Sequence, residues 1–479
     1  MSDVPPGLED LRLYDTRTRS VRTFEASAPP AVGIYTCGPT VYAPQHLGNM
    51  RSQLVPDVLR RVLLAAEYEV TYVTNITDVG HLVSDADEGE DKVEQAAAAS
   101  GRTATEIAAH WTEQWATDRA RLGCLEPDVL PKAASHIDEQ IAMVEALERL
   151  GHTYVLDDGV YFDVASHPRY AEFAHLDLAE LATSGRVERV EEKRHPADFA
   201  LWKRTAPGVV RQQEWDSPWG RGFPGWHIEC SAMATRYLGS RFDIHTGGVD
   251  HVRVHHTNEV AQSECALDVH PWVGWWVHTE FLDLGGAKMS KSKGDVLVVD
   301  TLVERGLDPL AFRYFTLQAH YRQQQAFTFE AVQAADTALR RLIGHAVAAR
   351  DAGGAVTDPE RVDAYRRRFW AALGDDLNTS QALAVASEAS KADDLGPAER
   401  WAVLADADRV LGFGLADARS PLPDDSGSDE RIDGLVAERE SARAARDFAT
   451  ADRVRAELAA EGVEIVDTPT GPTWRHRAD

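Results

Sequence analysis

Four residues that lie far apart in the chain offer the ligand types that a zinc ion prefers. Cys37 and Cys230 supply thiolates, and the segment VHHTNE supplies the imidazole of His255 and the carboxylate of Glu259. His255 and Glu259 are four residues apart, so on a helix they share one face. The two cysteines must be brought in by the fold from distant strand ends. The residues alone leave two interpretations open, a metal site or two free thiols that fill the core.

Phosphate chemistry is indicated at two other places. The sequence HLGN puts His46 and Gly48 at the amino end of an expected helix, where a side-chain donor, close backbone approach and the helix dipole favour a triphosphate. The later sequence KMSKS puts Lys288 and Lys291 on a glycine-flanked loop, where two ammonium groups can neutralise charge on a leaving pyrophosphate. Each motif alone also fits a bland interpretation, a capping histidine or a solvated surface loop.

Together, HLGN and the downstream KMSKS resemble the paired HIGH and KMSKS motifs of class I aminoacyl-tRNA synthetases, in the same order. Asn49 stands where that motif has its second histidine, and Leu47 replaces isoleucine. Asparagine still donates a hydrogen bond but carries no charge. We therefore expect the transition-state contact at Asn49 to be kept in altered form.

The segments CGPTVY, PGWHIECSAM, FDIHTGGVDH and HHTNEVAQSE resemble the cysteinyl-tRNA synthetases within that class, and the likeness runs through nearly the whole chain. The resemblance implies one zinc ion per chain, held by Cys37, Cys230, His255 and Glu259. Zinc gains far more from a substrate thiolate than from the hydroxyl of serine, so cysteine can be selected by a bond and a separate editing site becomes unnecessary.

The same resemblance implies roles for further residues. Thr77, Trp226 and His227 are expected to contact the cysteine substrate, although Trp226 could also be a core aromatic in a stretch that reads as irregular or strand-like. His251 and His256 receive no assignment. The expected catalytic residues are His46, Asn49, Lys288 and Lys291. The expected ATP-binding residues are Gly38, Thr40, Gly48, His245, Gly247, Gly248, Asp250 and Lys291.

The elements that must position these residues begin with a βαβ unit. Residues 33–37 and 68–75 are expected as strands and 51–66 as a helix, with a kink or a later start because of Pro56. Ligands collect at the carboxyl ends of such parallel strands, here after Cys37 and Asn75. Residues 133–150 read as a helix, and Asp158-Gly159 predicts a hairpin turn in a segment that interrupts the βαβ rhythm.

We therefore predict an α/β protein with a Rossmann-type parallel-sheet catalytic domain at 1–308, interrupted by an insertion at about 125–215. An α-helical bundle follows at 309–417, then a linker at 418–431 rich in Pro, Ser, Gly and Asp, and a small α+β domain at 432–479. By resemblance the bundle supports tRNA and the small domain reads the anticodon. Arg443, Asp452 and Asp467 are the expected tRNA-binding residues.

Length and composition limit the number of domains and the classes of function that the chain can have. The 479 residues exceed what one core usually organises, and the four cysteines are too scattered for a disulfide framework. The net charge of -27 argues against a general nucleic-acid binder, so tRNA must meet local basic patches. The chain shows no long apolar run and no leader-like N-terminus, and we expect a cytoplasmic monomer with no membrane partner.

The implied reaction is a cysteine–tRNA ligation with ATP and magnesium, L-cysteine and tRNA(Cys) as partners. A rival is the mycothiol-pathway ligase, whose catalytic domain is similar but which joins cysteine to an amino sugar and lacks the tRNA-reading tail. A second rival is a non-catalytic paralogue that binds tRNA. Such a paralogue should have lost a zinc ligand or a KMSKS lysine, and here all are present.

Overall fold

A computed structural model describes most of the chain. The described residues are 4–79, 92–175, 193–206, 208–283, 296–419, 430–445, 447–460, 463–468 and 471–476. The KMSKS lysines, Lys288 and Lys291, lie outside these ranges.

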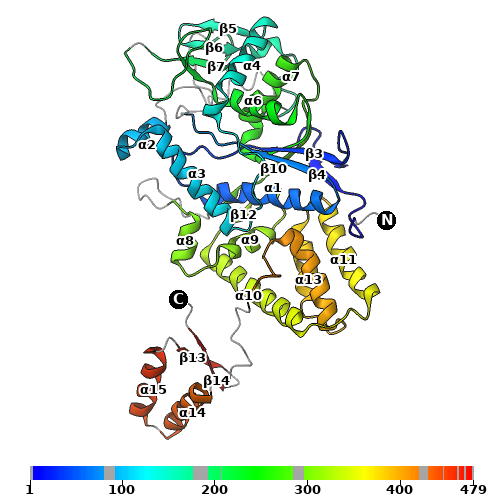
Figure 1. The fold of residues 1–479 in the computed structure, drawn as a ribbon, viewed down its shortest axis with the longest axis vertical. Helices are drawn as coiled ribbons and strands as arrows, with labels where there is room; N and C mark the ends of the chain where they lie inside the picture. The colour runs from blue at the N-terminus through cyan, green and yellow to red at the C-terminus, as the bar shows by residue number, and fades with distance from the viewer. Residues whose placement is uncertain are drawn as a thin grey trace.

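A four-stranded parallel sheet forms the centre of the chain's larger part (Figure 1). Its strands are β3 (Ala31–Thr36), β4 (Glu69–Thr74), β9 (Phe242–Gly248) and β10 (Val273–Thr279), in the order β10-β9-β3-β4. The expected strands at 33–37 and 68–75 are confirmed as β3 and β4, and they pair in parallel. The Rossmann-type fold class is therefore confirmed, and the carboxyl ends of all four strands lie at one edge.

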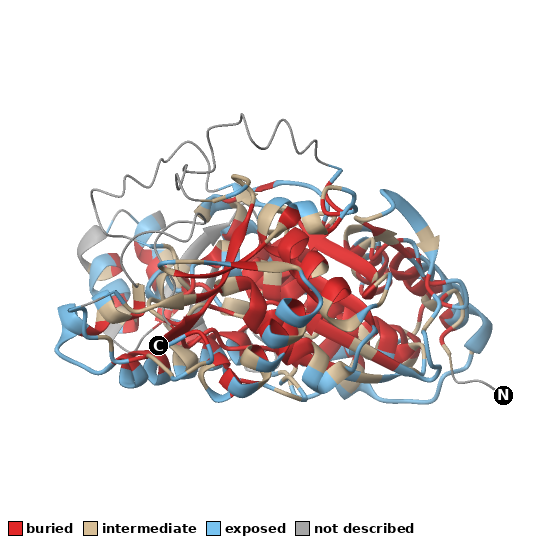
Figure 2. Cartoon of the chain, turned by 90° about the horizontal axis from the view of Figure 1, so that it is seen from above, coloured by how far each residue is buried: buried red, intermediate tan, exposed pale blue. Residues whose placement is uncertain are grey.

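Helices cover both faces of this sheet, which is why the strands are buried (Figure 2). Helix α1 (Leu47–Ala65) packs on one face against β4, β9 and β10, and α6 (Trp226–Leu238) packs on the other against β3 and β4. The expected later start of α1 is wrong, because the helix begins at Leu47 and runs through the buried Pro56. Burial of α1 along most of its length offsets the helix-breaking tendency of proline.

The segment between β4 and β9 adds helices and a second sheet. Its helices are α2 (Lys92–Ser100), α3 (Ala104–Arg121) and α4 (Ile137–Arg149), with short 3-10 turns at Ala133–Ser135 and Val164–Ser166. Its antiparallel sheet comprises β5 (Thr153–Leu156), β6 (Gly159–Phe162), β7 (Phe199–Arg204) and β8 (Gly222–Pro224). The predicted hairpin at Asp158-Gly159 is confirmed, because β5 and β6 pair in antiparallel register across it.

Shorter elements complete the larger part. They are β1 (Arg12–Asp15), β2 (Ser20–Thr23), η3 (Val249–His251), η4 (Val252–His256), α7 (Thr257–Leu267), β11 (Leu282–Asp283), α8 (Val299–Glu304) and β12 (Gln325–Ala326). Helix α7 follows β9 through the two short turns η3 and η4 and leads to β10, so it completes a crossover between parallel strands.

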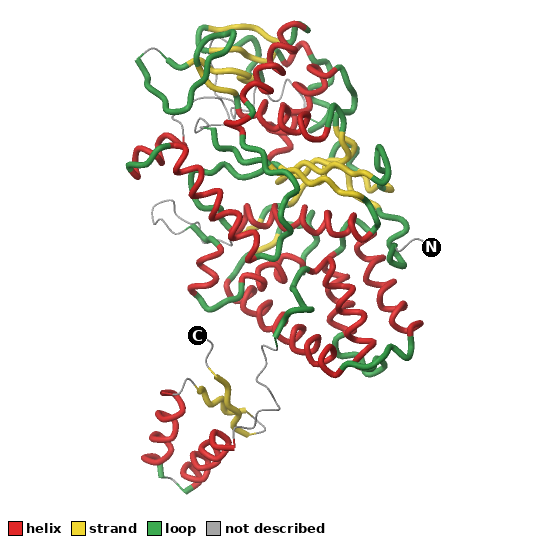
Figure 3. Tube along the Cα trace, in the orientation of Figure 1, coloured by secondary structure: helices red, strands yellow, loops and turns green. Residues whose placement is uncertain are grey.

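A helical region follows the sheet in the chain (Figure 3). It comprises α9 (Pro309–Leu317), α10 (Phe329–Ala352), α11 (Pro359–Gly374), α12 (Thr379–Ala389) and α13 (Pro397–Leu411). The last elements, α14 (Glu430–Ala444), α15 (Phe448–Ala460), β13 (Val463–Thr468) and β14 (Gly471–His476), form a small unit with its own apolar cluster. Within the described ranges, every helix is too short or too polar to span a membrane.

A buried ion pair ties the helical region to α1. The guanidinium of Arg313, on α9, donates to Asp57 Oδ2 at 2.8 Å and to the backbone carbonyl of Leu411 at the end of α13. It also donates to the carbonyl of Leu122, just after α3, at 3.2 Å. Burial opposes the charge on Asp57, but Arg313 and Arg61 outweigh it and lower the pKa of that carboxyl. One side chain thus joins α1, α3, α9 and α13.

Replacing Arg313 by methionine leaves Asp57 buried beside carbonyl groups without this cation. We expect Arg313→Met to lower the free energy of unfolding by about 3–5 kcal/mol, because an uncompensated buried charge is costly. Urea titration followed by circular dichroism measures the change. As a control, Arg368→Met breaks the exposed pair with Glu388 and should change stability by about 1 kcal/mol or less. Equal effects of the two substitutions would contradict the role given to Arg313.

Asp118, on α3, should make the stability of the folded protein depend on pH. Burial, together with the nearby carboxylate of Asp300, raises its pKa to about 6. A raised carboxyl pKa means that the folded state prefers the protonated form, so stability falls as pH rises from about 4 to about 6. We expect Asp118→Asn to be more stable than wild type at pH 8 by about 1–2 kcal/mol, with partial solvent screening allowed for. The advantage should vanish at pH 4, and an equal gain at both pH values would contradict this assignment.

Candidate metal and nucleotide site

The site lies where the parallel strands end. Cys37 directly follows β3, and its N–H donates to the carbonyl of Thr246 on β9 at 3.4 Å. Gly247 and Gly248 end β9, and β4 leads into Asn75 and Thr77. Three separate stretches of sequence therefore place polar side chains at one edge of the sheet, as expected for a fold of this class.

Cys230 reaches this edge from a helix. The expectation that residues near Trp226 are irregular or strand-like is wrong, because β8 ends at Pro224 and α6 begins at Trp226 after Gly225. Trp226 and Cys230 are four residues apart on α6, so they share one face. Helix α6 packs against β3, and this packing brings the Sγ atoms of Cys230 and Cys37 to 3.9 Å from each other.

His255 and Glu259 also approach the thiols. His255 is the penultimate residue of the π-helical turn η4, Glu259 lies in the first turn of α7, and Nε2 of His255 is 2.8 Å from Oε1 of Glu259. The four donor atoms of Cys37, Cys230, His255 and Glu259 all lie within 4.8 Å of one another, and all four residues are buried. The arrangement and the donor types fit a tetrahedral metal ion of the zinc kind.

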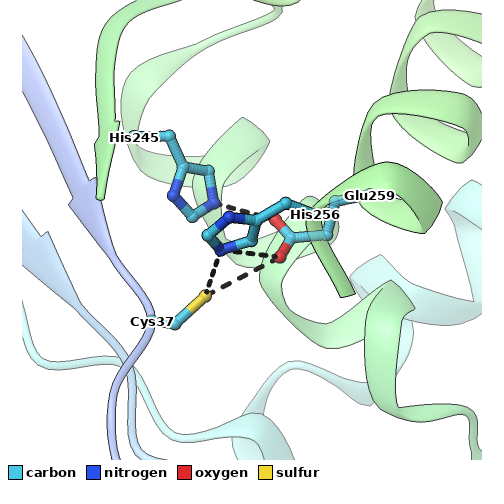
Figure 4. A group of neighbouring side chains, drawn as sticks. All are labelled: Cys37, His245, His256 and Glu259. Atoms are coloured by element: carbon cyan, nitrogen blue, oxygen red, sulfur yellow. Dashed lines mark hydrogen bonds and ion pairs between the residues drawn. The ribbon is translucent and has the colours of Figure 1, made fainter. Parts of the chain in front are cut away.

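A second possible group shares two of these residues. Figure 4 shows Cys37 and Glu259 together with His245 and His256, whose donor atoms also lie within 4.8 Å of one another. Nε2 of His256 is 3.4 Å from the Cys37 Sγ atom, and Nε2 of His245 is 2.9 Å from Oε2 of Glu259. Sequence analysis left His256 unassigned, because an extra histidine in a histidine-rich stretch is more often a supporting or solvated residue than a ligand.

The surrounding hydrogen bonds favour the group with two thiols. Nδ1 of His255 is engaged with Nδ1 of His227 at 3.0 Å, which leaves Nε2 facing the thiols. His245 occupies Oε2 of Glu259, which leaves Oε1 directed at Cys37 and His255. Such outer contacts orient metal ligands in proteins. His245 is fully buried, stacked on Trp276 at 4.5 Å, so it holds Glu259 from behind.

The electrostatics of the cluster also suit a cation. The hydrogen bond from Cys37 lowers the pKa of Cys230 to about 7, although burial opposes this, whereas burial raises the pKa of Cys37 well above its usual value. Burial works against a charge on His255, but Glu259 and Cys230 raise its pKa to about 10. The proton on His255 thus balances the buried negative charge of Glu259, and the proton on Cys37 keeps that thiol neutral. A divalent cation can replace those protons.

The expected substrate residues surround this cluster. The ring of Trp226 lies 4.6 Å from that of His255, and His227 contacts His255 directly. The backbone N–H of Thr77 donates to the carbonyl of Pro39 at 3.0 Å, which joins it to the loop after β3. Asn75, to which sequence reasoning gave no role, donates to Thr77 Oγ1 at 3.0 Å.

The expected nucleotide residues lie on the loops beside it. His46 caps α1, where its Nδ1 accepts the backbone N–H of Asn49 at 3.1 Å, and partial burial lowers its pKa while the carboxylate of Asp250 opposes the shift. The side-chain amide of Asn49 donates to Gln45 at 2.8 Å. Gly48 lies against the His46 ring, since a Cβ there would be 3.0 Å from that ring.

Two further expected nucleotide residues lie at the same edge of the sheet, whereas the three expected tRNA-binding residues lie on the small C-terminal unit. Thr40 forms a β-bridge with Thr77, and Gly38 donates its backbone N–H to Asn75 Oδ1 at 2.9 Å. Arg443 lies on α14, where it pairs with Glu440 at 3.2 Å. Asp452 is exposed on α15, and Asp467 lies in β13. The structure thus gathers the expected metal and cysteine-contacting residues at one point and leaves these three on the small unit.

Two family models match the chain. Residues 23–337 match the model described as tRNA synthetases class I (C) catalytic domain. Residues 425–475 match the model described as cysteinyl-tRNA ligase anticodon binding domain.

Curated relatives match over almost the whole length. The chain is 48% identical over 463 residues to "Cysteine--tRNA ligase 1" of Burkholderia lata, covering 96% of each chain. It is 40% identical over 483 residues to the cysteine–tRNA ligase of Thermus thermophilus, covering 97% of this chain and 99% of the other. A solved methionyl-tRNA synthetase of Mycobacterium tuberculosis in complex with methionyl-adenylate aligns at TM-score 0.53 over 80% of this chain and 90% of the other, with 15% identity, which shows a shared fold.

The crowding at Gly38 gives a test of the geometry at this edge. A Cβ at Gly38 would be 1.5 Å from the backbone oxygen of Asn75, a clash that no side-chain rotation relieves. We expect Gly38→Ala to lower the free energy of unfolding by about 2–4 kcal/mol, the range of strongly disruptive substitutions. Thermal unfolding followed by circular dichroism measures this. Gly434→Ala, on α14 with nothing within 4 Å, should be neutral or slightly stabilising. An unchanged melting curve for Gly38→Ala would refute the contact.

Proposed function

The chain belongs to the cysteinyl-tRNA ligases of the class I aminoacyl-tRNA synthetases, and we propose that a zinc ion held by its buried cluster selects cysteine. The protein is a ligase that joins cysteine to tRNA at the expense of ATP. The observation that carries the proposal is the approach of Cys37, Cys230, His255 and Glu259 within 4.8 Å of one another. Zinc bound there would favour a substrate thiolate over the hydroxyl of serine.

The residues around the cluster hold the amino acid. Thr77 is fixed through the loop after β3 and through Asn75, so its hydroxyl is oriented before substrate arrives. Trp226 and His227, at the start of α6, close the other side of the cluster. This arrangement supports their role as the cysteine-contacting residues and His245 as a residue that positions Glu259.

We propose that ATP, with its magnesium ion, binds next to the cluster of Cys37, Cys230, His255 and Glu259. Gly38, Gly48, Gly247 and Gly248 let Asn75 and the side chains of His46, His256 and Asp250 pack directly against the backbone of these loops. Thr40 and Asp250 supply polar groups at the same edge. The positive end of α1 and His46 favour phosphate oxygens. In this proposal Asn49 remains a catalytic residue, together with Lys288 and Lys291 of the KMSKS sequence.

The reaction then runs in two steps. A carboxylate oxygen of cysteine attacks the α-phosphorus of ATP, the new oxygen–phosphorus bond forms, and the bond to the departing pyrophosphate breaks. Next the 2′-hydroxyl of the terminal adenosine of tRNA attacks the carbonyl carbon, loses its proton and displaces AMP. His46, Lys288 and Lys291 stabilise the phosphate charges of the first step by position and electrostatics.

The acceptor is assigned to tRNA(Cys) through the small C-terminal unit. We infer that Arg443, Asp452 and Asp467 contact anticodon bases and that the helices of 309–417 support the tRNA. The boundaries at 308, 417 and 431 divide catalytic, bundle and anticodon-binding domains. We assign the protein as a monomer of the cytoplasm. The amino-sugar ligase and the silent paralogue are not favoured, because the anticodon-domain match and all four ligands are present.

The deciding experiment is cysteine-dependent exchange of labelled pyrophosphate into ATP, followed by charging of tRNA(Cys) or of glucosaminyl-inositol. Wild type should exchange only with cysteine and charge only tRNA. We expect Cys230→Ser to reduce zinc affinity by at least about 100-fold, since even outer contacts of a metal are worth 10–100-fold, and to abolish exchange. Metal analysis and the exchange rate give the two readouts.

The matched control is Cys124→Ser, which alters a cysteine outside the cluster. It should keep its zinc and exchange within about threefold of wild type, as expected of a substitution away from the site. Retention of zinc and exchange by Cys230→Ser would refute the zinc proposal. Transfer to the amino sugar alone would reassign the acceptor.

A further inference from the structure

His251 lies between the metal cluster and the nucleotide loop. It ends η3, the short turn after β9, and its ring lies 5.3 Å from that of His255 and 5.1 Å from that of His256. On the other side, a Cβ at Gly247 would be 2.8 Å from its Nδ1 atom, and its Nε2 is 3.9 Å from Asp250 Oδ2. It therefore lies where a cysteine held by the cluster meets an ATP held by the glycines.

The ring of His251 has a hydrogen-bond donor to offer. Nδ1 is buried and has no hydrogen-bond partner among the residues that the structure describes. Nε2 is beyond hydrogen-bond distance of the Asp250 carboxylate. A neutral imidazole carries one N–H in either tautomer, and a buried polar group left unsatisfied is costly. Nδ1 is enclosed, so the nitrogen that a substrate can reach is Nε2, on a side chain that is 25% exposed. The tautomer with its proton on Nε2 offers that N–H to a substrate oxygen.

The donor at Asn49 is partly committed elsewhere. Its side-chain amide donates to Gln45 Oε1, and its backbone N–H donates to His46. Asn49 replaces the second imidazole of the HIGH-type motif, so that motif offers one imidazole fewer to the phosphates. Asp250 connects the HIGH-type motif with His251. Its carboxylate opposes the lowering of the His46 pKa and lies 3.9 Å from Nε2 of His251.

We propose that His251 is a further substrate-contacting residue, which donates its ring N–H to the oxygens at the junction of the cysteine carboxylate and the α-phosphate of ATP. The contact strengthens as the oxygen–phosphorus bond forms and the bond to pyrophosphate breaks, and no proton leaves His251. This proposal rests on the proposed function, since it assumes that cysteine and ATP meet at this edge. It makes His251 part of the activation step and no part of metal binding.

The test compares His251→Leu, which removes the donor, with His251→Gln, which keeps an N–H. Cysteine-dependent pyrophosphate exchange is measured together with the zinc content of each variant. We expect His251→Leu to lower kcat by about 10²–10³, the usual effect of losing one such donor, with KM for cysteine within about threefold of wild type. Zinc should remain at one per chain, and His251→Gln should recover at least about tenfold in kcat over His251→Leu.

The control is His152→Leu, which removes a half-buried histidine bonded to Ser166 outside the site. It should exchange at the wild-type rate. A His251→Leu kcat within about threefold of wild type would overturn the proposal, and so would loss of zinc from both His251 variants. If His251→Leu does not fold, His251→Ala replaces it, because it removes the donor without adding bulk. Absence of exchange in the wild type would instead overturn the proposed function.

Discussion

A carboxylate with no exposed surface, that of Glu259, is the interaction on which the rest of the site depends. A buried charge is tolerated only when it is paired, and Glu259 is paired by His245 at 2.9 Å and by His255 at 2.8 Å. These contacts fix α7 to β9. Cys37, at the end of β3, approaches the same carboxylate at 3.7 Å. The candidate metal-binding cluster is thus also the joint between the helix and the sheet.

The edge of the sheet then brings the two groups of candidate site residues together. Parallel strands end on one side, so the loops after β3, β4 and β9 meet although more than a hundred residues separate β4 from β9. The cluster lies toward α6 and α7, and the glycine loops lie toward the amino end of α1, where the helix dipole favours phosphate. His251 lies between the two. In the proposed function, selection of the thiol and stabilisation of phosphate charge are therefore separate tasks of neighbouring groups.

Sequence patterns predicted the elements with strong local signals. The apolar, β-branched run of β4 and the Asp158-Gly159 turn are local features, and both were correctly placed. The interpretation of the stretch after Pro224 as irregular or strand-like was wrong, because its helix is buried on most faces and lacks a clear polar side. Of the two alternatives expected at Pro56, a kink or a later start, the later start was wrong, because tertiary burial of α1 overrides the local preference of proline.

By itself the sequence determined the donor types, the phosphate motifs and their order, since these follow from residue chemistry and from likeness to a family. It selected His255 through its spacing from Glu259 and the family likeness, but it could not show which way the neighbouring histidine rings face. His255 and His256 are adjacent in the chain, and only the packing of α7 against α6 decides that His255 lies with Cys230 while His256 is held by His278 at 2.7 Å. The unsatisfied nitrogen of His251 is likewise a tertiary fact. Hydrogen-bond partners contributed by distant strands decide such orientations, and no local pattern records them.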